Sequence, residues 1–208
     1  SGVGKTRAEI EYAIKQEILL INSESLSEVL TIEKVARKLN KVVNIGLRLN
    51  PDTDAQTLKQ ISTGKSENKF GVDKKTFIKI INLMKNSKFI KIKCLSVHIG
   101  SQILNHQPYL KMLKILNKII NKSGHRFDFI DLGGGMGIPY ENNSKQLNYK
   151  KYNNAIYKFL KNHNSNVIFE PGRSIVGNSG VLISKVTYIK ETNNKNFIIL
   201  DVGMNDLM

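Results

Sequence analysis

The chain has 208 residues, of which 40% are hydrophobic and 24% are charged, and its formal net charge is +15 at pH 7. This composition is ordinary for a globular protein, and no apolar run approaches the roughly 20 residues that a membrane-spanning helix needs. The sequence shows no secretory signal, and its single cysteine, Cys94, has no partner for an internal disulfide. We therefore expect a soluble, cytoplasmic protein that does not bind membranes, with Cys94 buried in a strand.

The positive charge raises nucleic acid as an alternative partner. The excess is nearly all lysine, however, and the lysines are spread over every predicted helix rather than gathered in one patch. The sequence also has no RNA-binding aromatic motif and no helix-turn-helix signature. We expect solvated lysine faces and no nucleic-acid partner; tight, salt-dependent binding to unrelated DNA would favour the alternative.

Apolar residues at helical spacing alternate with short apolar runs along most of the chain. Ser25 and Glu28 have the spacing of a capping box, which marks the start of the second helix. The predicted helices cover residues 5–17, 25–39, 74–86, 107–121 and 146–162, and the strands that follow them cover residues 18–21, 42–49, 90–98, 127–132 and 166–169.

Buried strands separated by helices predict an α/β fold with a parallel sheet, as a barrel or as a doubly wound sheet. His98, the glycines from Gly133 to Gly135, and Glu170 each follow a strand directly, at the rim where β/α barrels build ligand sites. We predict a partial TIM-type barrel at residues 1–175. The strand-like runs at 181–189 and 196–200 then predict the start of an antiparallel β domain at residues 176–208.

The first residues, SGVGKT, are similar to the end of a phosphate-binding P-loop. No apolar run ending in aspartate follows at a suitable distance, as a nucleotide site of that class requires. A glycine-rich turn that caps a helix explains the same residues. We favour the cap over the nucleotide site.

The glycine run Gly133, Gly134 and Gly135 follows the strand that ends near Leu132. Consecutive glycines let backbone N–H groups approach a phosphate without interference from Cβ atoms. A tight turn is the alternative interpretation of such a run. Combined with its place at a strand end, the run is interpreted as a phosphate-binding loop.

Glu170, Pro171, Gly172 and Arg173 follow the last predicted strand of the barrel, so a carboxylate and a guanidinium lie close together at its mouth. A surface ion pair is the simpler interpretation, and such pairs contribute little to stability. A carboxylate beside a pyridine nitrogen favours the protonated ring, and an arginine can bind a phosphate or carboxylate with two parallel hydrogen bonds. These residues are therefore candidates for a cofactor site.

His98 begins the HIGSQ string, directly after the strand that ends at Val97. A single histidine at a strand end is more often structural than functional. Its place on the same rim as the glycine run and Glu170 favours a cofactor site. A metal site is not expected, because the four histidines lack ligand spacing with Asp, Glu or Cys.

Together, these strings resemble the fold-type III pyridoxal-phosphate-dependent decarboxylases, whose barrel is of the alanine-racemase type, and within them the diaminopimelate decarboxylases. The resemblance rests on several strings in order. They are SGVGKT at 1–6, LRLNP at 47–51, ISTG at 61–64, ENKFG at 67–71, HIGSQI at 98–103, DLGGGMG at 131–137, EPGR at 170–173 and GMNDL at 203–207.

The resemblance implies pyridoxal 5'-phosphate as cofactor and a small amino acid as substrate. It implies that His98 stacks on the cofactor ring and that Glu170 pairs with the ring nitrogen, which makes these two the candidate catalytic residues. Ser101, the glycine loop, Pro171, Gly172 and Arg173 would complete the cofactor site, and Arg173 would also contact the substrate. Lys69 would help to hold a homodimer with shared active sites.

The implied reaction is decarboxylation of meso-2,6-diaminopimelate to L-lysine and carbon dioxide. The family's Schiff-base lysine would precede Ser1, and a cysteine from the partner subunit and further substrate-binding residues would follow Met208. We therefore expect the chain by itself to be inactive. An ornithine-type or arginine-type decarboxylase of the same fold is one alternative, and an inactive pyridoxal-phosphate-binding fragment is another.

Overall fold

The computed structural model describes residues 1–55, 64, 69–141 and 146–206. Contacts between residues divide the chain into two units, Ser1–Ser174 and Ile175–Met208. Within the described ranges, no helix is both long and apolar enough to cross a membrane. The two units are described separately below.

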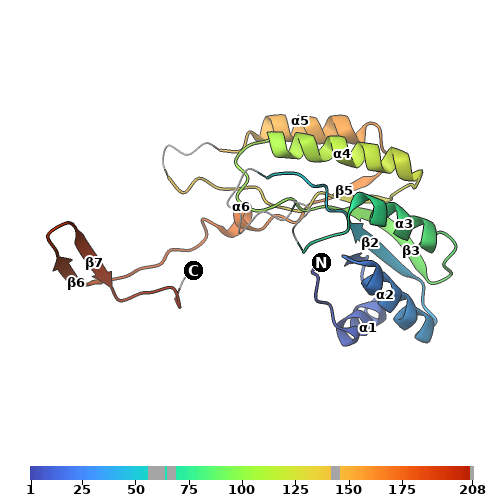
Figure 1. The fold of residues 1–208 in the computed structure, drawn as a ribbon, viewed down its shortest axis with the longest axis horizontal. Helices are drawn as coiled ribbons and strands as arrows, with labels where there is room; N and C mark the ends of the chain where they lie inside the picture. Colours follow the sequence, from blue (N-terminus) through green and yellow to red (C-terminus); the bar gives the residue numbers. More distant parts are fainter. Residues whose placement is uncertain (56–63, 65–68, 142–145, 207–208) are drawn as a thin grey trace. The chain divides into compact units, whose positions relative to one another are not determined.

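The first unit is built on a parallel sheet whose described strands are β1 (Ile21–Ser23), β2 (Val43–Arg48), β3 (Ile90–Ser96), β4 (Phe129–Asp131) and β5 (Asn166–Ile168) (Figure 1). Each strand pairs with the one that follows it in the chain, in the order β1-β2-β3-β4-β5. A doubly wound sheet would reverse its strand order part-way, whereas a β/α barrel keeps it. The predicted barrel-type arrangement is confirmed.

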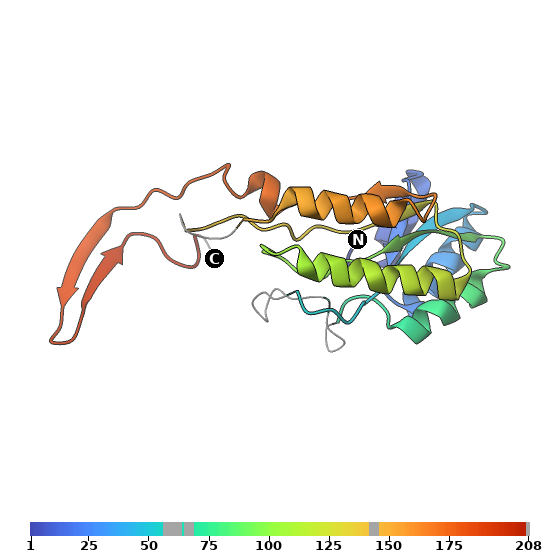
Figure 2. The same ribbon diagram turned by 90° about the horizontal axis from the view of Figure 1, so that it is seen from above.

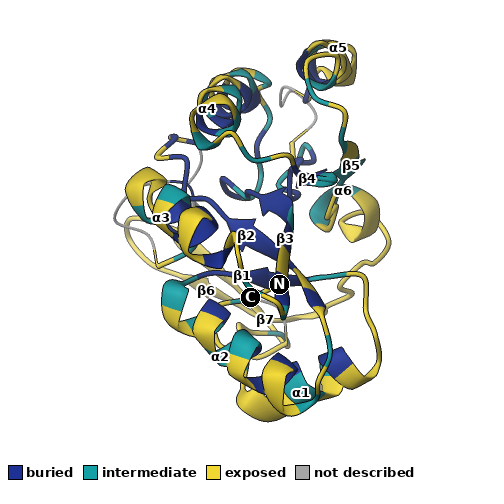
Figure 3. Cartoon of the chain, turned by 90° about the vertical axis from the view of Figure 1, so that its right-hand side faces the viewer, coloured by how far each residue is buried: buried dark blue, intermediate teal, exposed yellow. Residues whose placement is uncertain are grey.

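Helices α1 to α5 alternate with the strands in sequence and follow one another around one side of the sheet (Figure 3). Neighbours in this series are in contact, namely α1 with α2, α3 with α4, and α4 with α5. Their bounds are Arg7–Lys15 for α1, Leu26–Lys38 for α2, Lys74–Met84 for α3, Gln107–Ser123 for α4, Tyr149–Leu160 for α5 and Arg173–Val176 for the short α6. The predicted helices 74–86, 107–121 and 146–162 are confirmed to within a few residues, a normal uncertainty for helix ends.

The two faces of the sheet differ in chemistry because successive side chains of a strand point to opposite sides. Ile45, Leu95 and Ile130 belong to the hydrophobic core that the helices cover. Their neighbours Ser96 and Asp131 are buried as well, but they are polar and hydrogen-bonded to each other. One face is therefore an ordinary apolar core, and the other is a buried polar interior.

The amino ends of β1 and β2 differ from the prediction. The predicted strand at 18–21 is wrong in its placement, because α1 ends at Lys15 and Glu17 then adopts a left-handed backbone with φ 53°. Ile18 and Leu19 are about half exposed, at 50% and 59%. An apolar run alone did not show where the turn between helix and strand would fall.

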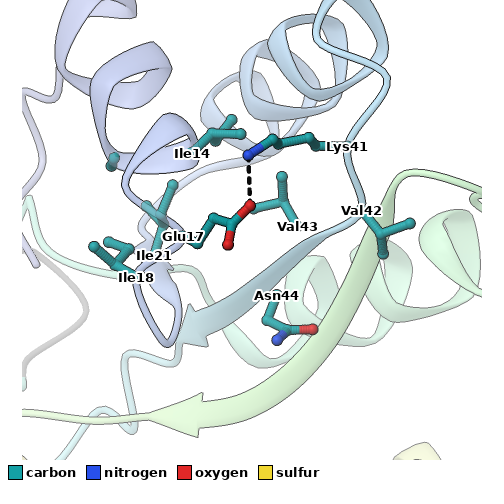
Figure 4. A pocket seen from close by; sticks show the side chains of 9 residues that line it. Ile14, Glu17, Ile18, Ile21, Lys41, Val42, Val43 and Asn44 are labelled. Atoms are coloured by element: carbon teal, nitrogen blue, oxygen red, sulfur yellow. Dashed lines mark hydrogen bonds and ion pairs between the residues drawn. The ribbon is translucent and has the colours of Figure 1, made fainter.

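A cavity of about 310 Å³ lies beside this turn, lined mainly by apolar side chains of α1, β1 and β2 (Figure 4). The ion pair between Lys41 Nζ and Glu17 Oε1, at 2.6 Å, is part of its lining (Figure 4). The cavity lies at the amino ends of the strands, whereas the candidate residues lie at their carboxyl ends. It is therefore separate from the candidate site.

The helix caps are partly as predicted. Ser25 Oγ accepts the hydrogen bond from the Glu28 amide, but the Glu28 carboxylate accepts from the Glu24 amide, so the reciprocal half of the box is displaced by one residue. The complete capping box is at Thr6 and Glu9. The opening SGVGKT segment therefore forms a helix cap, as favoured over a nucleotide loop, and Lys5 forms an ion pair with Glu28 at 2.7 Å.

The second unit contains an antiparallel hairpin of β6 (Val186–Glu191) and β7 (Asn196–Leu200). The predicted strand at 196–200 is confirmed. The predicted strand at 181–189 begins later than expected, since residues 181–185 have no strand pairing. Apolar side chains of both strands are exposed, Tyr188 and Ile198 among them, so the hairpin has no hydrophobic core of its own.

Helix α3 offers a matched test of the core. Ile80 is fully buried against the sheet, whereas Leu83, less than one turn away, is 53% exposed. We expect Ile80→Ala to lower the free energy of unfolding by about 2–5 kcal/mol, because it removes buried atoms and leaves a cavity. Leu83→Ala should change it by less than about 0.5 kcal/mol. Urea unfolding measures both, and equal losses would contradict this arrangement of α3.

Candidate functional site

The candidate residues share one rim because strands β3, β4 and β5 are in register. Ser96 pairs with Asp131, and Asp131 pairs with Ile168. His98, Gly133 and Glu170 each follow one of these three residues by two positions. The strand pairing therefore brings together three residues that lie far apart in the sequence.

His98 faces the glycine loop. The Gly134 amide donates a hydrogen bond to His98 Nδ1 at 3.1 Å, so Nδ1 is the unprotonated nitrogen of the ring. Burial, reinforced by the positive charge of Arg48, lowers the pKa of His98 below its ordinary value. The imidazole is therefore neutral at pH 7, with its proton on Nε2.

The glycine loop is packed between the two neighbouring rim loops. Gly133 and Gly135 adopt left-handed backbones, with φ values of 64° and 92°. A Cβ atom on Gly134 would lie 2.1 Å from the Glu170 carbonyl oxygen, and one on Gly135 would lie 2.0 Å from the Gly100 carbonyl oxygen. Neighbouring backbone therefore demands glycine here, in addition to any ligand.

Hydrogen bonds fix the same contacts. The Glu170 amide donates to the Gly133 carbonyl at 2.9 Å, and the Ile103 amide donates to the Gly135 carbonyl at 2.8 Å. From the helix side, the Tyr109 hydroxyl donates to the Gly134 carbonyl at 3.2 Å. The carbonyl oxygens of Gly133, Gly134 and Gly135 therefore each accept a hydrogen bond from a neighbouring part of the protein.

Glu170 and Arg173 follow β5 on this rim. Glu170, Pro171 and Gly172 are exposed, and Glu170 Oε1 accepts a hydrogen bond from Ser1 Oγ at 2.9 Å. Arg173, half-buried at the start of α6, donates to Gln102 Oε1 at 3.3 Å. The two side chains do not form an ion pair with each other, so the simple surface-pair interpretation of this string is wrong.

Gln102 links the loops and was not singled out from the sequence. Its amide also bonds the backbone of Ile138, donating to the carbonyl and accepting from the N–H. Its backbone is left-handed, with φ 60°, which is uncommon for a residue other than glycine. The predicted residue Ser101 is adjacent and half-buried. The sequence signal for this role was a polar residue in the HIGSQ string, directly after a strand.

A buried ion pair borders the rim near the ends of β1 and β2. Arg48 Nη1 lies 2.9 Å from Glu24 Oε1, and Glu24 Oε2 accepts from the Gly71 amide at 3.0 Å. The Arg48 guanidinium also lies over the Phe70 ring, 4.9 Å from its centroid. The sequence analysis did not single out Glu24, although Glu24 comes just after a strand, β1, as His98 comes just after β3.

Lys69 and Cys94 were also singled out in the sequence. Lys69 is exposed and lies beside Phe70, while the rest of its ENKFG string up to Asn68 and residues 61–63 of the ISTG string fall outside the described residues. Cys94 is buried in β3, as predicted, and burial raises the pKa of its thiol to about 12. It is a thiol rather than a thiolate at neutral pH, which excludes it as a nucleophile in this fold.

The described part of the chain contains no group of three or more His, Cys, Asp or Glu side chains that could hold a metal ion. The site instead has a neutral imidazole, a carboxylate, a guanidinium and backbone amides on a glycine loop. These groups are of the kinds that can bind an organic cofactor with a phosphate and a ring nitrogen.

Comparison with known proteins identifies that cofactor. The family described as pyridoxal-dependent decarboxylase, pyridoxal binding domain, matches residues 1–177. The chain belongs to this family. Pyridoxal phosphate is accordingly the cofactor, and the donor set on the rim fits it.

Curated relatives agree along the whole chain. Diaminopimelate decarboxylase of Helicobacter pylori is 42% identical over 212 aligned residues, which include 100% of this chain and 52% of that protein. Diaminopimelate decarboxylase of Aquifex aeolicus is 38% identical, again over 100% of this chain and 50% of that protein. The chain thus spans about half the length of the curated relatives it matches.

Solved structures share the fold. The H. pylori diaminopimelate decarboxylase complexed with L-lysine superposes with a TM-score of 0.92 at 42% identity, over 99% of this chain and 52% of that chain. The M. jannaschii enzyme in co-complex with L-lysine has a TM-score of 0.86 at 32% identity, over 99% of this chain and 50% of that chain. A pyridoxal-dependent decarboxylase barrel is therefore the fold of the first unit.

Glycine substitutions test the packing of the rim. Gly134→Ala places its Cβ against the Glu170 carbonyl and should lower the free energy of unfolding by about 1–3 kcal/mol, because the two loops must separate. Gly172→Ala is the matched control, since no atom lies within 4 Å of its added Cβ. Denaturant unfolding distinguishes them, and a Gly134→Ala variant as stable as Gly172→Ala would refute the close packing.

Proposed function

We propose that the protein carrying this chain is a pyridoxal-phosphate-dependent decarboxylase that converts meso-2,6-diaminopimelate to L-lysine and carbon dioxide. The rim on which His98, the glycine loop and Glu170 stand in register carries this proposal. It is supported by the 42% identity to a diaminopimelate decarboxylase along the whole chain and by the likeness to two such enzymes solved with L-lysine.

Pyridoxal phosphate, when bound, supplies an aromatic system that accepts the electron pair left behind by the departing carboxylate. The ring accepts that pair best when its nitrogen is protonated. Glu170 is the residue that we assign to this proton. Its carboxylate accepts hydrogen bonds, stands on the exposed rim and is held through one oxygen by Ser1, so a ring N–H has a negative partner there.

His98 is assigned to the face of the cofactor ring. Its Nδ1 is committed to the Gly134 amide, which fixes the plane of the imidazole relative to the loop. A neutral imidazole adds no positive charge beside the ring, so it does not compete with Glu170 for control of the ring proton. We assign to His98 the tasks of stacking on the ring and shielding one face from water.

The phosphate is assigned to Gly133, Gly134 and Gly135, Ser101, and the Pro171–Gly172–Arg173 turn. The Gly133 and Gly134 amides already donate to Asp131 and His98, so the Gly135 amide and the Ser101 hydroxyl are the donors that we assign to phosphate oxygens. Arg173 donates to Gln102 Oε1, the same oxygen that accepts from the Ile138 amide, so its guanidinium is held beside the segment that follows the glycine loop. We assign it to the phosphate region and to a substrate carboxylate, both of which accept two parallel hydrogen bonds.

We further propose that the protein acts in the cytoplasm as a homodimer with shared active sites, in which exposed Lys69 contributes to the subunit contact. The family resemblance of the ENKFG string supports the dimer. Light scattering of the purified protein measures the assembly, and a monomer that retains full activity would contradict shared sites.

The carboxylate of Glu170 is the first target for testing. We expect Glu170→Gln in the full-length protein to lower kcat by about a hundredfold or more, because the ring proton loses its charged partner, while pyridoxal phosphate still binds. Glu11→Gln, which removes only the surface ion pairs of Glu11 with Lys15 on α1 and Lys38 on α2, serves as the matched control. Near-normal turnover by the Glu170→Gln protein would refute the assigned role.

Substrate identity requires a separate measurement. Release of carbon dioxide from meso-2,6-diaminopimelate, L-ornithine and L-arginine should be compared at equal enzyme concentration, with L-lysine identified as the product of the first. We expect turnover only with diaminopimelate. Preferential turnover of ornithine or arginine would keep the reaction class and overturn the substrate.

A further inference from the structure

Glu170 is connected to a second, buried carboxylate by a continuous chain of hydrogen bonds. Ser1 Oγ donates to Glu170 Oε1 at 2.9 Å. Asn22 Nδ2, on β1, donates to Ser1 Oγ at 3.2 Å and to Asp131 Oδ2, on β4, at 2.9 Å. These hydrogen bonds thus connect Asp131, in the polar interior of the sheet, to Glu170 on the exposed rim through the Asn22 amide and the Ser1 hydroxyl.

The chemistry of the groups fixes the direction of every bond. An amide nitrogen only donates, so the Ser1 hydroxyl must accept from Asn22 and has its own hydrogen to give to Glu170. Glu170 Oε1 is therefore held as an acceptor. At the other end, Asp131 accepts from Asn22, from Ser96 Oγ at 3.0 Å and from the Gly133 amide at 2.9 Å.

The surrounding strands are shaped to hold this chain. Gly46 pairs with Asn22 in the parallel ladder, and a Cβ on Gly46 would lie 1.9 Å from Asn22 Oδ1. Because Gly46 has no side chain, the Asn22 amide can occupy the space beside β2. Asp131 is 1% exposed and also holds the first amide of the glycine loop, so one buried carboxylate contacts both parts of the rim.

We propose that Asp131, Asn22 and Ser1 are positioning residues that orient Glu170 and keep it as the hydrogen-bond acceptor for the cofactor ring nitrogen. The inference rests on the proposed role of Glu170. None of the three touches the reacting atoms; Ser1 and Asn22 act through Glu170. The negative charge of Asp131 also adds to that of Glu170, and both favour a positive charge on the ring nitrogen.

Ser1→Ala is the sharpest test, because it removes only the hydroxyl that links Asn22 to Glu170. In the full-length protein loaded with pyridoxal phosphate labelled with ¹⁵N in its ring, we expect the ring-nitrogen chemical shift to move toward the unprotonated form. We also expect kcat to fall about tenfold with little change in KM, the effect of losing one hydrogen bond to a charged group. Ser1→Thr, which keeps the hydroxyl, should restore both.

Controls separate this idea from a structural effect. Ser165→Ala removes a hydroxyl that bonds the Phe127 carbonyl beyond the amino ends of the strands, and it should leave the ring-nitrogen shift unchanged. Asp131→Asn removes the buried charge and replaces one acceptor oxygen with a donor NH2, facing either Asn22 and Ser96 or the Gly133 amide, and it should move the shift in the same direction as Ser1→Ala. Should Asp131→Asn fail to fold, Ser1→Ala with its threonine rescue still decides the matter.

The outcomes distinguish the two proposals. If Glu170→Gln moves the ring-nitrogen shift and Ser1→Ala does not, Glu170 keeps its role and the positioning chain is refuted. If neither variant moves the shift, the assigned role of Glu170 is refuted. The positioning role of Asp131, Asn22 and Ser1 is then refuted with it. A shift that moves in both variants, is restored by Ser1→Thr and is unaffected by Ser165→Ala supports the chain.

Discussion

The parallel pairing of β3, β4 and β5 is the constraint on which the site depends. Its register places Ser96, Asp131 and Ile168 side by side, and the functional candidates follow at the same distance along each strand. β4 and β5 are only three residues long, so few backbone hydrogen bonds set this alignment. A slip of one residue would turn each side chain to the other face of the sheet and separate His98 from Gly134.

The polar interior of the sheet explains how such short strands hold their alignment. Burial raises the pKa of Asp131, which shows that its charged form is disfavoured by its surroundings. Hydrogen bonds from Asn22 on β1, Ser96 on β3 and the Gly133 amide in the glycine loop oppose that effect. The carboxylate is therefore a point at which β1, β3 and the glycine loop are tied to β4, and satisfying it requires the native register.

The sequence was sufficient for the order of helices and strands, because long amphipathic helices such as α3 and α4 bury a clear apolar face. It was insufficient where a short apolar run had two possible roles, as at Ile18 and Leu19, which are exposed in a turn. His98, the glycine loop and Glu170 could be found because each follows a strand. Asn22 and Gln102 could not, because their roles arise from partners that are distant in the sequence.

The glycine loop shows how a motif can be found for one reason and be required for another. The glycines were singled out as a place where amides approach a phosphate, and nothing in that argument demands that all three be glycine. In the structure, the space beside Gly134 and Gly135 is taken by the carbonyls of Glu170 and Gly100. The loop must be narrow because it fills the gap between the loops after β3 and β5. Close packing of these backbones directs the loop amides, and the phosphate site that we assign to them depends on that packing.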